Sequence, residues 1–209
     1  TAGTYTSDWR MVRESVHWFG DTHTKSVAVV APPMADIIIE SRTGGKNHGW
    51  YAEDGAWLDS EADCTATGCT ANIGSRYTST YRSVVGVRAA IYSPYFPATG
   101  HYKVYVAWAD RSDLRTPIRH TITHAGGNTN VNIDQTGTAN AWTLLGTFTF
   151  NAGYNGSLRI SNEAIDVSGS MVASAARFIQ QDGSPPPPTP PDVIIESRTS
   201  GKNYGLYED

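Results

Sequence analysis

Two histidines, His120 and His124, stand four positions apart, a spacing that binds zinc on a helix when a glutamate lies between them. Here the intervening residues are Thr-Ile-Thr, which favour a β-strand, and they include no glutamate. In a strand both imidazoles share a face with Ile118 and Ile122. We therefore interpret them as core or cross-strand histidines.

A serine nucleophile has no supporting pattern. The sequence contains no Gly-x-Ser-x-Gly element, and Gly169-Ser170-Met171 lies at the start of a predicted strand. The members of a catalytic triad need not be adjacent, but nothing in the pattern nominates one. We expect a protein that is not an enzyme.

Several acids in or beside predicted loops could supply oxygen ligands for Ca²⁺. None has EF-hand spacing, so we prefer to interpret them as solvated loop acids and expect no cofactor. These residues are Asp110, Asp113, Asp134, Glu163 and Asp166.

Cysteine occurs twice, as Cys64 and Cys69 in the segment DCTATGC. Two thiols this close, among Thr, Gly and Asp, suit a small loop closed by a disulfide in an oxidising compartment. Free thiols are the second interpretation. Zinc is the third, because it would need two more ligands nearby.

Aromatic residues near predicted loops are candidates for a sugar-binding platform, because sugar binding needs an exposed ring face beside polar groups. Trp50, Tyr51 and Trp57 in the loop-rich stretch 44–63 either anchor the end of the core or form such a platform. The glycan-facing candidates are Trp57, Tyr92, Tyr95 and Phe96, and the alternative is that they pack the edges of the core.

A net charge of −4 gives no electrostatic basis for binding nucleic acid. No apolar run reaches the length of a membrane span. The low lysine content and the many Thr, Ser, Asn, Gly and Tyr residues favour an extracellular or cell-surface location.

The sequence repeats itself. Residues 192–209 read DVIIESRTSGKNYGLYED, and residues 36–53 read DIIIESRTGGKNHGWYAE, with twelve of eighteen positions identical. A repeat at a fixed offset is typical of tandem modules. It predicts a complete module at 36–180 and the first strand of a following repeat at 192–209. The expected assembly strand is Asp192, Val193, Ile194, Ile195 and Glu196.

The remaining segments are interpreted around that module. Residues 1–19 resemble the module's end, since Met11-Val12 matches Met171-Val172, and we interpret them as the tail of a preceding repeat. Two unrelated strands of similar composition are the alternative. We expect a linker at 20–35 and a second, proline-rich linker at 181–191, where PPPPTPP favours a stiff polyproline II spacer.

Short segments with a period of two follow one another from residue 76 onward. Gly and Asn separate them, and no stretch sustains a helical period. We predict an all-β fold, an antiparallel β-sandwich of jelly-roll type, in tandem modules joined by proline-rich linkers. The predicted strands lie around 36–41, 87–92, 102–108, 118–124, 131–133, 142–150, 158–160 and 171–179.

Three motifs follow in order, HTITHAGGN at 120–128, VNIDQ at 131–135 and WTLLGTFTFNAG at 142–153. Together with YKVYVAW at 102–108 and residues 171–178, they resemble the golvesin / xanthan lyase C-terminal carbohydrate-binding-like domain over roughly 50–180. The resemblance implies an extracellular bacterial β-sandwich module, often appended to a lyase, hydrolase or peptidase. It brings no catalytic residues, and the DCTATGC loop departs from the family pattern.

Two functions follow. The repeat and the proline run favour a non-catalytic structural or adhesive array, a stalk or filament whose partners are neighbouring copies of the module. Strand-mediated assembly through residues 192–196 extends that hypothesis. The resemblance favours the alternative, a carbohydrate-binding accessory module of a secreted bacterial enzyme, with a polysaccharide as partner.

Overall fold

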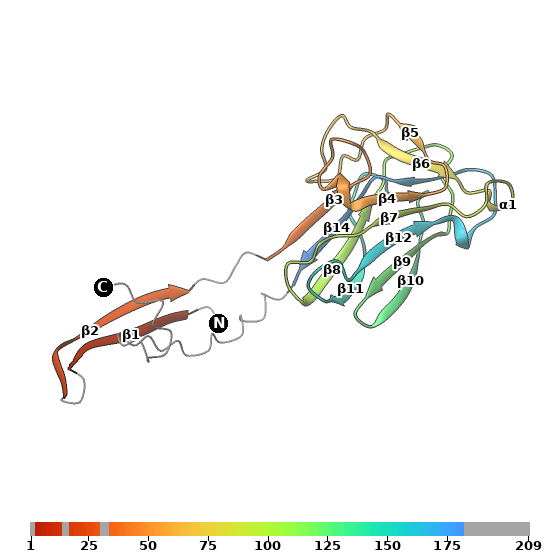
Figure 1. Ribbon diagram of the computed structural model, residues 1–209. Helices are drawn as coiled ribbons and strands as arrows, with labels where there is room; N and C mark the ends of the chain where they lie inside the picture. Colours follow the sequence, from red (N-terminus) through yellow and green to blue (C-terminus); the bar gives the residue numbers. More distant parts are fainter. Residues whose placement is uncertain (1–2, 14–16, 30–33, 182–209) are drawn as a thin grey trace. The chain divides into compact units, whose positions relative to one another are not determined.

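The computed structural model describes residues 3–13, 17–29 and 34–181, which fall into two compact units (Figure 1). The proline-rich segment and the expected assembly strand, Asp192 to Glu196, lie outside these residues. Each unit is described by itself.

The first unit contains an antiparallel pair of long strands, β1 (Gly3–Arg13) and β2 (His17–Val29). Their register runs from Gly3 opposite Val29 to Arg13 opposite His17, with an irregularity between Trp9 and Met11. The structure therefore differs from the linker expected at 20–35, because residues 20–29 belong to a strand. Thr and Val in this segment favour extended backbone once a partner strand is present.

One layer of the second unit is a five-stranded antiparallel sheet, in the order β10-β9-β12-β7-β4. Strands β9 and β10 form a hairpin in which His124 lies opposite Gly127. The five strands are β4 (Tyr51–Asp54), β7 (Ala89–Tyr92), β9 (Ile118–His124), β10 (Gly127–Ile133) and β12 (Ser157–Ser161).

The facing layer is a four-stranded antiparallel sheet, in the order β11-β8-β14-β3. A smaller sheet, β13-β6-β5, lies beside the two layers (Figure 1). The seven strands are β3 (Asp36–Glu40), β5 (Leu58–Ser60), β6 (Ser75–Ser79), β8 (Gly100–Ala107), β11 (Thr143–Phe150), β13 (Ser170–Ala173) and β14 (Ala175–Gln180).

The core fills the space between the sheets, as the alternation in the sequence predicts. Phe96, Tyr102, Phe150 and Phe178 are fully buried. Phe96 stacks on Phe150 with ring centroids 4.3 Å apart, and Tyr102 and Phe178 meet Phe96 edge-on. The predicted antiparallel β-sandwich is confirmed.

The predicted last strand, 171–179, is divided in two at Ser174. The Ser174 hydroxyl oxygen accepts a hydrogen bond from the Ala109 amide at 3.0 Å, and its carbonyl accepts one from the Ser41 amide at 2.9 Å. Because Ser174 bonds to two other segments, the chain leaves the small sheet as β13 and enters the four-stranded sheet as β14.

The two histidines of β9 occupy the environments that the strand pattern predicts. His120 is fully buried, and its Nδ1 lies 3.0 Å from the Ile118 carbonyl oxygen. Burial lowers the pKa of His120 to about 4, because the charged imidazolium is not solvated in the core. His124 is partly exposed and contacts Thr129 Oγ1 on the neighbouring strand at 3.0 Å.

Helical segments are short in the described residues: α1 (Arg82–Val85), η1 (His48–Trp50) and η2 (Asn162–Ala164). Among these residues, no helix has the length and apolar character needed to cross a membrane.

Strand β3 lies at an edge of its sheet, but the loop that follows it covers that edge. The Asn47 side chain donates to the Ile38 carbonyl at 2.8 Å, and the Glu40 amide donates to the Lys46 carbonyl at 2.9 Å. His48 Nδ1 lies 3.4 Å from the Glu40 carbonyl oxygen. The outward-facing Ile38 carbonyl and the amide and carbonyl of Glu40 therefore already have partners within the chain before any other strand approaches.

Candidate functional site

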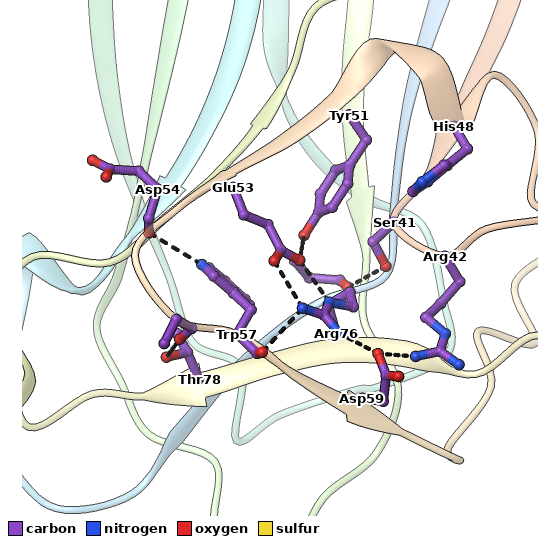
Figure 2. A network of polar contacts seen from close by, with 12 residues as sticks. Ser41, Arg42, His48, Tyr51, Glu53, Asp54, Trp57, Asp59, Arg76 and Thr78 are labelled. Carbon is purple, nitrogen blue, oxygen red and sulfur yellow. Dashed lines mark hydrogen bonds and ion pairs between the residues drawn. The ribbon is translucent and has the colours of Figure 1, made fainter.

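A cavity of about 470 Å³ lies where the loop after β3 and strand β4 meet the small sheet. Figure 2 shows that its charged side chains point toward one another across this space. Strand β4 supplies one wall, β5 and β6 the other, and η1 an end. The lining residues are Ser41, Arg42, Thr43, His48, Tyr51, Ala52, Glu53, Asp59 and Arg76.

Arg76 on β6 is the centre of this network. Its guanidinium donates to both carboxylate oxygens of Glu53, at 2.6 and 2.8 Å, and to the Trp57 carbonyl at 3.0 Å. The two hydrogen bonds to Glu53 fix the orientation of both the guanidinium plane and the carboxylate plane. The hydrogen bonds to Glu53 raise the pKa of Arg76, so its positive charge is permanent.

Asp59 on β5 bonds to two arginines, Arg42 and Arg76. Their hydrogen bonds lower the pKa of this exposed carboxyl. The Arg42 side chain also donates to the Ile73 carbonyl at 3.0 Å, so both arginines are held in place. Two positive and two negative charges therefore balance in the cavity.

Tyr51 closes the cavity on the side of β4. Its hydroxyl donates to Glu53 Oε1 at 2.9 Å, and its ring lies 5.1 Å from the buried Tyr92 ring. Burial raises the pKa of the Tyr51 hydroxyl, which therefore stays protonated. His48 lies nearby, with ring centroids 6.0 Å apart.

Three further rings form a second feature, which we call the aromatic cluster: Trp50, Tyr95 and Tyr154. The Tyr154 ring lies 6.3 Å from Trp50 and 5.2 Å from Tyr95, both in edge-on arrangements. Tyr154 is 66% exposed and Tyr95 is 45% exposed. The cluster thus presents aromatic surface to solvent.

Backbone hydrogen bonds position the cluster. Phe96 and Gly153 exchange two of them, at 2.9 and 2.8 Å, and so join the loop that carries Tyr95 to the loop that carries Tyr154. The Ser93 amide donates to the Trp50 carbonyl at 2.8 Å. The turn η1 thus supplies Trp50 to the cluster and His48 to the cavity.

The predicted glycan-facing residues fall into two groups. Trp57, Tyr92 and Phe96 are buried, so these three predictions are wrong. Trp57 points inward, and its indole donates to the Ala89 carbonyl at 3.1 Å. Tyr92 is buried in the core, and Phe96 stacks on Phe150 there. Tyr95 is exposed and belongs to the cluster.

The sequence pattern did not identify Tyr154 as a glycan-facing candidate. It left Trp50 open as either a core anchor or part of a platform. Tyr154 lies in the segment Asn-Ala-Gly-Tyr-Asn-Gly, whose Gly and Asn residues indicate an exposed turn. An aromatic residue in such a turn is the signal that could have identified it.

Cys64 and Cys69 form a disulfide, as predicted. The acids considered for Ca²⁺ serve other bonds: Asp113 pairs with Arg111, Asp134 bonds to Thr136, and Glu163 pairs with Arg159. Asp166 bonds to Ser83 and Asp110 is exposed. Within the described ranges, no group of three or more His, Cys, Asp or Glu is arranged to hold a metal ion.

Comparison with known proteins identifies related domains. The family model of the Golvesin C-terminal domain matches residues 46–180. Xanthan lyase of Bacillus sp. (strain GL1) is 30% identical over 149 residues, which cover 71% of this chain and 15% of that protein. The chain therefore corresponds to a small part of this relative.

The solved structure of a xanthan lyase shares the fold. Paenibacillus xanthan lyase superposes with a TM-score of 0.59 at 24% identity, over 76% of this chain and 14% of that one. A CBM35 from Paenibacillus barcinonensis superposes with a TM-score of 0.43 at 15% identity, over 69% of this chain and 98% of that one.

Proposed function

Because this chain belongs to the Golvesin C-terminal domain family, we propose that residues 36–180 form a non-catalytic carbohydrate-binding module. The observation that carries this proposal is the exposed aromatic cluster, connected through η1 to a polar cavity. Saccharide rings have apolar C–H faces and polar rims, so they need both kinds of surface.

In this proposal the exposed rings of Tyr95 and Tyr154 contact the apolar face of a sugar. The cavity contributes hydrogen-bonding groups for sugar hydroxyls, including the neutral Tyr51 hydroxyl and the side chains of Arg42 and Asp59. Their mutual contacts hold these groups in place before ligand arrives, which reduces the entropic cost of binding.

The state of the charged side chains supports a binding role. Arg76 is bonded to Glu53 and Asp59, and Asp59 is also bonded to Arg42. A general acid needs a carboxyl group whose pKa is raised, whereas the arginines lower the pKa of Asp59. We propose that any catalysis belongs to another domain of a longer protein, as in a polysaccharide lyase.

We further propose that the protein works outside a bacterial cell. The Cys64–Cys69 disulfide is typical of oxidising compartments and supports this location. A polysaccharide is the partner that fits such a module there.

The test is affinity electrophoresis of the 209-residue chain in gels that contain xanthan, other anionic polysaccharides or neutral glucans. We expect at least one of them to retard the protein. Tyr154→Ala should weaken that interaction about tenfold, since loss of about 60 Å² of apolar contact costs about 1.5 kcal/mol.

Tyr81→Ala is the matched control, because Tyr81 is 42% exposed but lies outside the aromatic cluster. It should leave retardation unchanged. Wild-type migration that is unaffected across the whole panel would refute the proposal, and so would equal effects of the two variants.

The sequence echo at 192–209 favours a second candidate, the non-catalytic structural or adhesive array. In that proposal, copies of the module form a stalk or filament, and residues 192–196 act as an assembly strand. Since the loop 46–48 covers β3, an added strand would have to use another sheet edge or replace β3. Negative-stain electron microscopy would show regular filaments if this proposal is correct and dispersed particles if it is not.

A further inference from the structure

The internal repeat has a conserved part and a variable part, which correspond to different contacts in the first copy. Within 36–47, only positions 37 and 44 differ from the second copy, whereas four of the six positions in 48–53 differ. The four differences replace His48 by Tyr204, Trp50 by Leu206, Ala52 by Glu208 and Glu53 by Asp209.

Six of the identical positions hold the segment on the sandwich. Asp36 forms a two-point ion pair with Arg177, at 2.7 and 2.8 Å. The buried Glu40 accepts hydrogen bonds from the Lys46 amide, the Thr70 amide and the Thr70 hydroxyl, at 2.7 to 2.8 Å. Each of the first-copy residues Asp36, Glu40 and Lys46 has an identical counterpart in 192–209.

Three more identical positions make contacts of the same kind. The Ser41 hydroxyl donates to the Ala173 carbonyl at 2.7 Å, the Arg42 side chain to the Ile73 carbonyl, and the Asn47 side chain to the Ile38 carbonyl. The second copy therefore retains the residue types that fix the strand and its covering loop in the first copy.

The changed positions surround the candidate site. His48, Ala52 and Glu53 line the cavity, and Trp50 belongs to the aromatic cluster. Glu53 differs from a freely varying surface residue, because it is partly buried and bonded to both Arg76 and Tyr51. Its replacement by aspartate keeps the charge but shortens the side chain.

We propose that His48, Trp50, Ala52 and Glu53 determine which saccharide the module binds, and that the residue types at the equivalent positions of 192–209 encode a different preference. This inference rests on the proposed carbohydrate-binding function. The exchanges remove one ring face at position 50 and an imidazole at position 48, and they add one negative charge at position 52. A site with the second set therefore disfavours anionic polysaccharides relative to neutral ones.

The experiment transfers the second set into the first copy of the 209-residue chain, as His48→Tyr, Trp50→Leu, Ala52→Glu and Glu53→Asp together. Affinities for xanthan, an anionic polysaccharide, and for hydroxyethyl cellulose, a neutral one, are measured by affinity electrophoresis. We expect the ratio of the affinity for xanthan to the affinity for hydroxyethyl cellulose to fall at least tenfold.

The matched control transfers the framework differences, Ile37→Val and Gly44→Ser, which should leave the ratio unchanged. If the fourfold variant does not fold, Trp50→Leu and Ala52→Glu serve as single variants, and each should lower the ratio about threefold or more. An unchanged ratio in folded variants, or the same shift in the control, would overturn the inference. Absence of binding by the wild-type chain to every polysaccharide of the panel would instead refute the proposed function on which the inference rests.

Discussion

Lowering the pH should destabilise this sandwich through one buried side chain, His120. Its ring is fully buried on β9, and its Nε2 has no hydrogen-bond partner among the described residues. Burial lowers its pKa from 6.5 to about 4. Well above pH 6.5 the ring is neutral in both the folded and the unfolded state, so the titration of His120 does not make the stability change with pH there.

Between pH 6.5 and pH 4 the unfolded chain binds a proton that the folded chain does not. The free energy of unfolding therefore falls by about 1.4 kcal/mol per pH unit within this window. From pH 7 to pH 5, the loss attributable to His120 is about 2 kcal/mol. The contribution of the neutral His120 ring to the free energy of unfolding is thus fully present above the ordinary pKa of histidine, and it is lost as the pH falls toward 4.

Urea unfolding at pH 7, 6 and 5, followed by tryptophan fluorescence, measures this loss in the wild type and in His120→Leu. The variant has no titrating ring, so its free energy of unfolding should fall about 2 kcal/mol less than that of the wild type. The lost hydrogen bond to Ile118 shifts the variant's stability by a similar amount at every pH. His124→Leu, on the same strand face but partly exposed, is the control and should retain the wild-type slope.

Parallel pH profiles for the wild type and His120→Leu would refute the reasoning. They would mean that the folded state accommodates an imidazolium at this position, for example by admitting water.

Three other changes have defined expected outcomes. Replacement of both Cys64 and Cys69 by serine opens a loop with a sequence separation of 5 and should cost about 2 kcal/mol, seen as a lower urea midpoint that is insensitive to reductant. Arg76→Met leaves Glu53 and Asp59 without that partner and should cost about 1–3 kcal/mol, whereas a cost below 0.5 kcal/mol would show that solvent screens the network. Asn47 has a left-handed backbone, with φ of 49°, and its side chain bonds to Ile38. Asn47→Ala should therefore lower the free energy of unfolding by about 1–2 kcal/mol. Asn47→Gly should cost less, because glycine adopts this backbone conformation readily.

The strands of the sandwich could be predicted because alternation directly reports which side chains face the core. Tyr102, Val104 and Val106 alternate with polar residues and are all buried. The disulfide was predictable for a similar local reason, since both thiols lie in one short loop. The β2 strand was not predicted, because its Thr and Ser residues also suit a linker and its pairing with β1 is not encoded in a hydrophobic pattern.

The candidate site depended on contacts between distant segments, which a single sequence does not display. Glu53 and Arg76 are 23 positions apart, and their pairing requires β4 to face β6 across the cavity. Exposure of aromatic residues was equally non-local. Tyr95 and Phe96 are neighbours in the chain, but the hydrogen bonds between Phe96 and Gly153 direct one ring to solvent and the other into the core.

The covered edge of β3 has a consequence for how this chain folds. A polypeptide that carries two segments as similar in sequence as 36–53 and 192–209 risks pairing the wrong copy during folding. The Lys46, Asn47 and His48 contacts engage the edge of β3 with the residues that directly follow it in the chain. Because that closure is local, it forms faster than any pairing with a segment 156 residues away. The first copy thus carries its own protection against strand mispairing and the aggregation that follows from it.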